Sequence, residues 1–190
     1  MTKRFAMMLV ALAMLAVGGC TTVSPEFGQR DIDALAAEIR GLGPNVDPRE
    51  ADRAARIAYT YSRQLTQDYG ITDPPLIHNA KVHSGERERG LCNHWAEDMH
   101  RRLSQENFRT LSALRAISPR SPFRIIHHTA VISPRGGTIY DGVVLDPWRN
   151  GGALHWQKTR ADDRYDWRPR PEVLKEMLSA KRARKAARAR

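Results

Sequence analysis

Two runs of β-branched residues separated by a turn sequence constrain the fold of this chain more than any other feature. The runs are Phe123–Ile132 and Thr138–Leu145, and Pro134-Arg135-Gly136-Gly137 lies between them. β-Branched residues favour extended strands, and glycines that follow a proline favour a reversal of the chain. The sequence therefore predicts an antiparallel hairpin and, with it, an antiparallel sheet.

Three segments before the hairpin carry apolar residues at helical spacing. They are residues 31–40, 48–69 and a helix that begins near residue 91 or 92. The second helix has the strongest start signal, because Asp47 is a suitable N-cap, Pro48 follows at the first helical position and Glu50 comes three residues after the cap. These patterns predict helices packed on the sheet.

The other segments give weaker signals. Residues 71–90 contain Asp73-Pro74-Pro75 and predict a loop, while 109–117 favours a strand. The aromatic residues between 148 and 167 predict a further strand or a packed loop, and a last amphipathic helix begins near Pro171. We therefore expect one α+β domain over residues 31–170, with N-terminal helices packed on a small antiparallel β-sheet, followed by a C-terminal basic helix over 171–190.

The N-terminus has the order of a secretory signal peptide. Lys3 and Arg4 precede an uncharged apolar run of about thirteen residues, which is shorter than the roughly 20 that a spanning helix needs. Gly18-Gly19-Cys20 resembles the lipobox of bacterial lipoproteins, which implies removal of residues 1–19, acylation of Cys20 and a tether over 20–30. An ordinary signal peptide cut nearby is the alternative.

The lipobox resemblance also implies a location. Several acyl chains anchor a protein stably to a membrane, so the expected partner at Cys20 is the bilayer. Thr21, in place of an aspartate after the cysteine, favours the outer membrane of a bacterial cell envelope, with the domain facing the periplasm.

The formal charge of +10 is concentrated at the ends of the chain. Six basic residues lie in Lys181–Arg190 and two more in the signal peptide, so the rest carries only about +2. A domain of balanced charge does not predict nucleic-acid binding. The basic tail is interpreted either as a solvated helix end or as a contact with anionic lipid.

Cys92 has no partner for a disulfide if Cys20 carries lipid. A lone thiol in an oxidising compartment is exposed to oxidation, so its presence indicates either chemistry or inert burial as a small apolar residue. Cys92 falls at the start of the third helix, where the helix dipole favours a thiolate.

A histidine and an acid follow Cys92 along the chain. The predicted strand contains His127 and His128, and the next strand ends near Asp146. A histidine can activate a thiol, and an acid on the adjoining strand, about 5 Å away, can orient that histidine. Side-chain alternation along the strand does not decide which of the two histidines meets the acid, since both faces of the strand are apolar. Alternatively, the histidine has only a packing role in the core, and the acid only starts a turn before Pro147.

In these segments, over roughly residues 75–168, the chain resembles the papain-like and transglutaminase-like superfamily of cysteine-histidine-acid enzymes. It also resembles a set of bacterial lipoproteins of unknown activity that share these short motifs. The resemblance favours His128, since small and branched residues follow it, and implies catalysis by Cys92, His128 and Asp146. It also implies a side-chain donor for the oxyanion, for which Asn79 is preferred over His78 or His83 because no glutamine occurs between 67 and 105.

The resulting expectation is a thiol-dependent hydrolase or acyl transferase that acts on amide bonds of an envelope peptide or protein. Such chemistry needs no cofactor. The four histidines between 78 and 100 do not match the spacing of a zinc signature, so no metal is expected. The alternative is an envelope binding or assembly lipoprotein that has the same fold and no activity.

Overall fold

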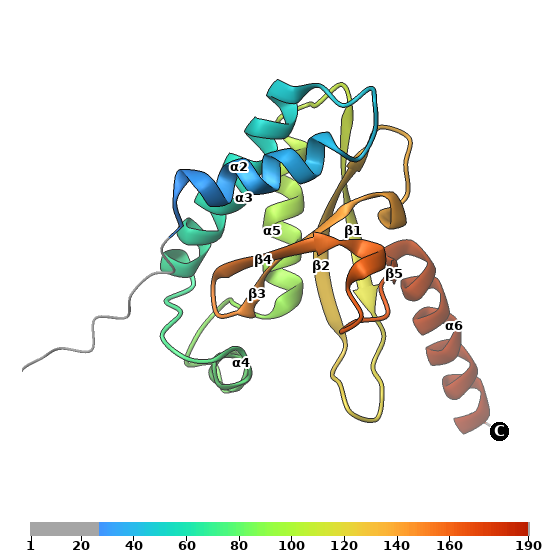
Figure 1. Cartoon of the computed structure of the whole chain (residues 1–190). Coiled ribbons are helices and arrows are strands. Elements are labelled where there is room, and N and C mark those ends of the chain that lie inside the picture. Colours follow the sequence, from blue (N-terminus) through green and yellow to red (C-terminus); the bar gives the residue numbers. More distant parts are fainter. Residues whose placement is uncertain (1–26, 190) are drawn as a thin grey trace, which may run out of the picture.

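The computed structural model describes residues 27–189, so the predicted signal peptide and Cys20 lie outside the described residues. The helices of this range are α2 (Gln29–Arg40), α3 (Pro48–Asp68), α4 (Pro75–His83), α5 (Cys92–Ser104) and α6 (Arg170–Arg188). The strands are β1 (Leu111–Ser118), β2 (His127–Pro134), β3 (Val143–Asn150), β4 (Ala153–Lys158) and β5 (Arg168–Pro169). They form one antiparallel sheet in the order β4-β3-β2-β1-β5. The predicted α+β class is confirmed (Figure 1).

The start of α3 ties the helical layer to the sheet. Asp47 caps the helix, because its carboxylate accepts a hydrogen bond of 2.8 Å from the backbone N–H of Arg49. Glu50 does not complete the capping box. Its buried carboxylate instead accepts hydrogen bonds of 2.7 and 2.8 Å from the backbone N–H groups of Arg109 and Thr110, next to β1. This carboxylate satisfies two backbone donors between α3 and the sheet.

Helix α5 lies against one face of the sheet, with α3 and α2 beyond it (Figure 1). Side chains alternate along a strand, so Ala130 and Ile132 of β2 and Leu145 of β3 point to the same face. These residues form the main core with the apolar stripes of α2, α3 and α5. Burial of this stripe on each helix explains why helical spacing predicted the three segments correctly.

The opposite face of the sheet is also covered. Val131 and Val144 pack there with Ala116, with Ile139 of the short 3₁₀ helix η1 (Ile139–Asp141) and with Trp167, which precedes β5. The chain after β4 therefore crosses this face, and each strand of the sheet centre is buried on both sides. This arrangement removes the alternation of apolar and polar residues that normally identifies the inner face of a strand.

Three predicted boundaries were wrong. The first hairpin strand was expected to begin at Phe123, but β2 begins at His127. Residues 71–90 were expected to form a loop, but α4 forms within them. Pro75 at its first turn fits a helix start, whereas only His78 is buried, so the segment lacks an apolar stripe. The second hairpin strand begins at Val143 and not at Thr138, because η1 occupies the connection.

The last helix, α6, extends away from the sheet (Figure 1). Val173 is its one buried residue within the described range, and the helix contacts β1 and β5 through its first part only. Within residues 27–189, every helix is too short or too polar to cross a bilayer.

Candidate functional site

A buried histidine-aspartate pair lies on the sheet face opposite α5. His127, at the start of β2, is bonded through Nε2 to Oδ2 of Asp146 on β3, at 2.7 Å. Both side chains are almost completely buried. Strands β2 and β3 are adjacent and antiparallel, which brings the two residues together although 19 positions separate them.

The preference for His128 as the partner of Asp146 is corrected by this geometry. His128 is the next residue of β2 and therefore points to the other face of the sheet. There it is half-buried on the side of α5, near the guanidinium groups of Arg115 and Arg170. The sequence left the two histidines open because both faces are apolar, and packing of the sheet places His127 beside the acid.

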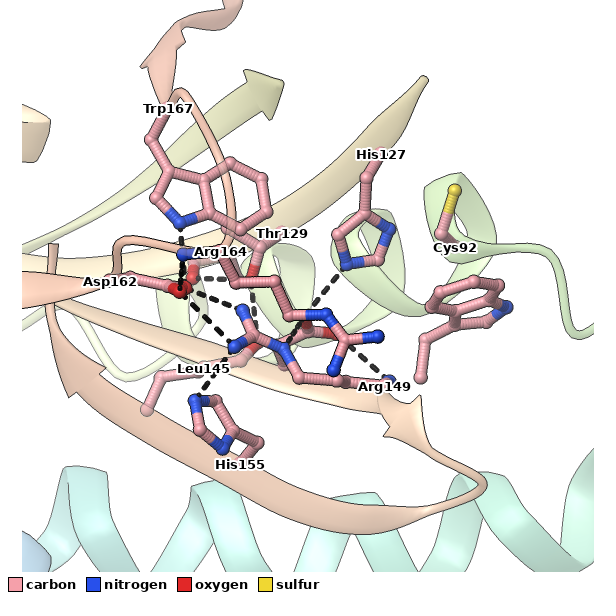
Figure 2. A network of polar contacts seen from close by, with 12 residues as sticks. Cys92, His127, Thr129, Leu145, Arg149, His155, Asp162, Arg164 and Trp167 are labelled. Atoms are coloured by element: carbon pink, nitrogen blue, oxygen red, sulfur yellow. Dashed lines mark hydrogen bonds and ion pairs between the residues drawn. The ribbon is translucent and has the colours of Figure 1, made fainter. Parts of the chain in front are cut away.

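Cys92 is the first residue of α5, and its side chain lies beside the imidazole of His127 (Figure 2). Its Sγ is 3.8 Å from the backbone oxygen of Ile126, the residue that precedes the histidine. The His127 Nδ1 atom has no hydrogen-bond partner among residues 27–189. This nitrogen is therefore free for the thiol, while Nε2 is held by the carboxylate.

The N-terminus of α5 leaves backbone donors open. The residue before the helix is Leu91, which has no side chain that can cap it. The backbone N–H groups of His94 and Trp95 bond to the Leu91 oxygen at 2.9 and 3.2 Å, whereas the N–H groups of the first helical residues have no acceptor within a helix. The N–H of Cys92 itself is one of these, and the positive end of the helix dipole lies at the same place.

The charges around Asp146 form a buried network (Figure 2). Arg149, three residues further along β3, donates through Nε to Oδ2 of Asp146 at 3.0 Å and through its terminal nitrogens to Asp162. Asp162 also accepts a 2.9 Å hydrogen bond from Nε1 of Trp167. His155 lies 2.9 Å from Arg149, so its Nε2 must accept from the guanidinium. Two carboxylates thus share one permanent cation.

This network sets the protonation of His127. Burial by itself lowers the pKa of a histidine, but the charge of Asp146 and the hydrogen bond to it, together with the Cys92 thiol, outweigh burial and raise the pKa of His127 to about 9. Burial likewise opposes the charge on Asp146, yet His127 and Arg149 hold its pKa below the usual value. Two cations then balance two carboxylates at neutral pH.

Three aromatic rings enclose the imidazole. The ring centroid of His127 lies 4.7 Å from Trp148, 4.5 Å from Tyr165 and 5.4 Å from Trp167. The three residues come from β3 and from the segment before β5, so two separate parts of the chain close the site. The rings exclude water and strengthen the ionic contacts of the imidazole, because screening is weaker in an apolar surrounding.

Asn79 is held at the side of this aromatic group. Its Oδ1 accepts a 3.1 Å hydrogen bond from Nε1 of Trp148. The indole nitrogen can only donate, so the amide oxygen of Asn79 must face it and the NH₂ group is left to donate elsewhere. His78 is less suited to that role, since it is buried and its Nε2 is 2.9 Å from the backbone oxygen of Arg89. His83 is exposed at the end of α4.

The segment that leads into Cys92 is locked by close packing. Gly90 has a φ of +123°, and a Cβ there would lie 2.2 Å from Nε2 of His78. Asp98 of α5 is buried and binds Arg89 at 2.9 Å and the hydroxyl of Tyr69 at 2.5 Å. These contacts connect the end of α3, α4 and α5 with the segment that leads into Cys92, and they hold this segment in place.

The other histidines of the first half do not gather into a site. The His94 ring accepts a 3.2 Å hydrogen bond from the Gly90 N–H, and His100 is half-buried further along α5. In the part of the chain that the structure describes, no group of three or more His, Cys, Asp or Glu residues is arranged to hold a metal ion.

Sequence reasoning missed the residues that surround the histidine-aspartate pair: Arg149, Asp162, Tyr165 and Trp167. Arg149 could have been found from the sequence, since this basic residue follows Asp146 by three positions near the end of a predicted strand. Asp162 carried no such signal, because its partner lies 13 residues away across a strand boundary.

The fold and the site together define an α+β domain in which a cysteine at a helix N-terminus, a histidine and an aspartate converge. No family model, no curated protein and no solved structure matches the chain.

Proposed function

We propose that this protein is a thiol-dependent hydrolase or acyl transferase of the cell envelope, acting on amide bonds of peptides or proteins. The observation that carries the proposal is the placement of His127, which binds Asp146 through one ring nitrogen and presents the other to Cys92. A nucleophile, a proton carrier and an orienting acid in this order are the parts that acyl transfer through a thiol requires.

In the acylation step, the Cys92 sulfur attacks the carbonyl carbon of the substrate. As the sulfur attacks, Nδ1 of His127 holds the proton of the thiol, and the imidazolium passes it to the leaving amine as the carbon-nitrogen bond breaks. Asp146 holds the ring in place and compensates its charge through the 2.7 Å contact. The products are a thioester on Cys92 and a free amine.

In the second step, water or an acceptor amine attacks the thioester. Nδ1 of His127 takes the proton of the attacking group, and the sulfur leaves, which restores the starting state. In both steps the oxyanion would be held by the backbone N–H of Cys92, at the uncapped end of α5, and by the free NH₂ group of Asn79. Hydrolase and transferase differ only in the group that attacks.

Other features support the setting of this activity. The resemblance of the cysteine, histidine and aspartate segments to papain-like and transglutaminase-like enzymes agrees with an amide or thioester mechanism without a cofactor. The lipobox-like segment at Cys20 supports an outer-membrane anchor with the domain in the periplasm. Peptides and proteins of the envelope are then the substrates within reach.

The test is alkylation of the full chain with iodoacetamide at pH 6, in a Cys20→Ser background that leaves Cys92 as the one thiol. An ordinary thiol is less than about 1% thiolate at this pH, whereas a thiol paired with an imidazolium reacts readily. His127→Ala is expected to slow the reaction on the order of a hundredfold. His128→Ala is the matched control, because its side chain lies on the other face, and should change the rate little.

A second candidate function is a binding or assembly lipoprotein without activity. The observation in its favour is the burial of Cys92, which is only 7% exposed. In that case the thiol would react with iodoacetamide only after denaturation, and His127→Ala would act on stability alone. This result would reject the enzyme proposal.

A further inference from the structure

Helix α6 carries a basic, partly apolar face that the domain does not use. Met177, Ala180, Lys181, Arg184, Lys185 and Arg188 follow one another along one side of the helix. They recur at positions i, i+3, i+4, i+7, i+8 and i+11, which places them on a single face of the helix. Met177 and Leu178 are 49% and 56% exposed, so the face begins with uncovered apolar area.

The basic part of α6, from Lys181 to Arg188, contains no acidic residue. Glu176 is the last acidic residue of the chain, and both of its carboxylate oxygens are bound by Arg168. All residues from Leu178 to Ala189 are exposed, and the helix extends away from the sheet (Figure 1). A long, exposed helix with a basic face and apolar residues at its start is suited to bind an anionic surface above an apolar layer.

From this charge complementarity, we propose that α6 docks on the surface of an anionic phospholipid bilayer. The basic side chains of Lys181, Arg184, Lys185 and Arg188 would contact phosphate groups, while Met177 enters the boundary of the acyl chains. The inference is independent of the proposed chemistry at Cys92.

The remaining exposed apolar residues fit the same orientation. Leu76 and Ile77 of α4 and Phe123 and Ile125 of the β1–β2 loop are the other large exposed hydrophobic residues of the described chain. In Figure 1, α4, this loop and the free part of α6 all reach toward the lower end of the molecule, where α5 begins. Docking of α6 would therefore bring the end that carries Cys92 close to the lipid.

Hydrogen exchange of the full chain in vesicles tests the proposal without interference from the N-terminal anchor. The protein is reconstituted in phosphatidylcholine vesicles with or without phosphatidylglycerol, and the backbone amides of residues 177–189 are followed. Exchange of these amides is expected to slow about tenfold in the anionic vesicles only, and high salt should abolish the effect.

The double variant Lys181→Glu/Arg184→Glu should lose this protection. Arg49→Glu/Arg56→Glu, which changes the same number of charges on exposed positions of α3, should retain it. Equal exchange in both vesicle types, or protection that survives in the α6 variant, would overturn the proposal. Iodoacetamide labelling of Cys92 in the α6 variant should equal that of the wild type, which separates this result from failure of the catalytic proposal.

Discussion

His127 and His128 are neighbours in β2, yet their imidazoles lie on opposite faces of the sheet and their pKa values move in opposite directions. Asp146 and Cys92 raise the pKa of His127 to about 9 against the effect of burial. Burial, together with the charges of Arg115, His127 and Arg170, lowers the pKa of His128 to about 4. At neutral pH one imidazole is therefore charged and the other is neutral.

Asp162 should affect the charge on His127 through Arg149, which binds both Asp162 and Asp146. In the Asp162→Asn variant, Arg149 is expected to interact more fully with Asp146, which weakens the pull of that carboxylate on the imidazolium. The pKa of His127 should fall from about 9 toward its ordinary value of 6.5, as measured by NMR titration of the imidazole. Asp163→Asn, an exposed neighbour, is the control and should leave the titration unchanged.

His128 should make the protein less stable in acid. Its pKa is about 4 in the folded state and 6.5 in the unfolded chain, so only the unfolded chain binds the proton between these values. The free energy of unfolding should therefore decrease as pH falls from 6.5 to 4, by at most about 3 kcal/mol from this residue.

In urea denaturation at pH 7 and pH 4.5, His128→Gln should show a smaller loss of stability than the wild type. The comparison isolates His128, because Asp146, Asp162 and Glu50 titrate alike in both proteins. An equal loss in the two proteins would show that His128 is not held neutral.

Asn79 should matter for acyl transfer and not for alkylation. Asn79→Ala removes the free NH₂ donor, so formation of the thioester from an activated ester is expected to fall about a hundredfold. Alkylation by iodoacetamide forms no oxyanion and should keep its rate. Trp148→Phe leaves the amide but removes the hydrogen bond that holds it, and a smaller loss of ester reactivity is expected. A parallel fall in both reactions would assign Asn79 to the packing of Cys92.

Gly90 should tolerate no side chain. Gly90→Ala combines a φ of +123° with a contact of 2.2 Å to His78, and we expect a loss of more than about 2 kcal/mol in the free energy of unfolding. Gly85→Ala has a φ of +81° but nothing within 4 Å, so backbone strain alone should cost about 1 kcal/mol. Urea denaturation of both variants measures the difference, and equal losses would contradict the packing of Gly90 on His78.

Helices α2, α3 and α5 were predictable because each carries a stripe of apolar residues at helical spacing. In α2, α3 and α5 the buried stripe recurs at three and four positions, and Asp47 and Pro48 mark a start that local geometry requires. Helix α4 escaped prediction because it buries only His78 and so has no stripe. The strand positions were approximately correct, although η1 shortened the second strand of the hairpin.

The sequence by itself determined the helical segments, the antiparallel sheet and the residue types from which a thiol site can be built. Only the tertiary structure decided that His127, and not His128, meets Asp146, and that Arg149 and Asp162 share its charge. The reason is that both faces of β2 are buried, one by α5 and the other by the segment around Trp167. Alternation along a strand assigns a residue to a face, but the elements packed on that face determine its contacts.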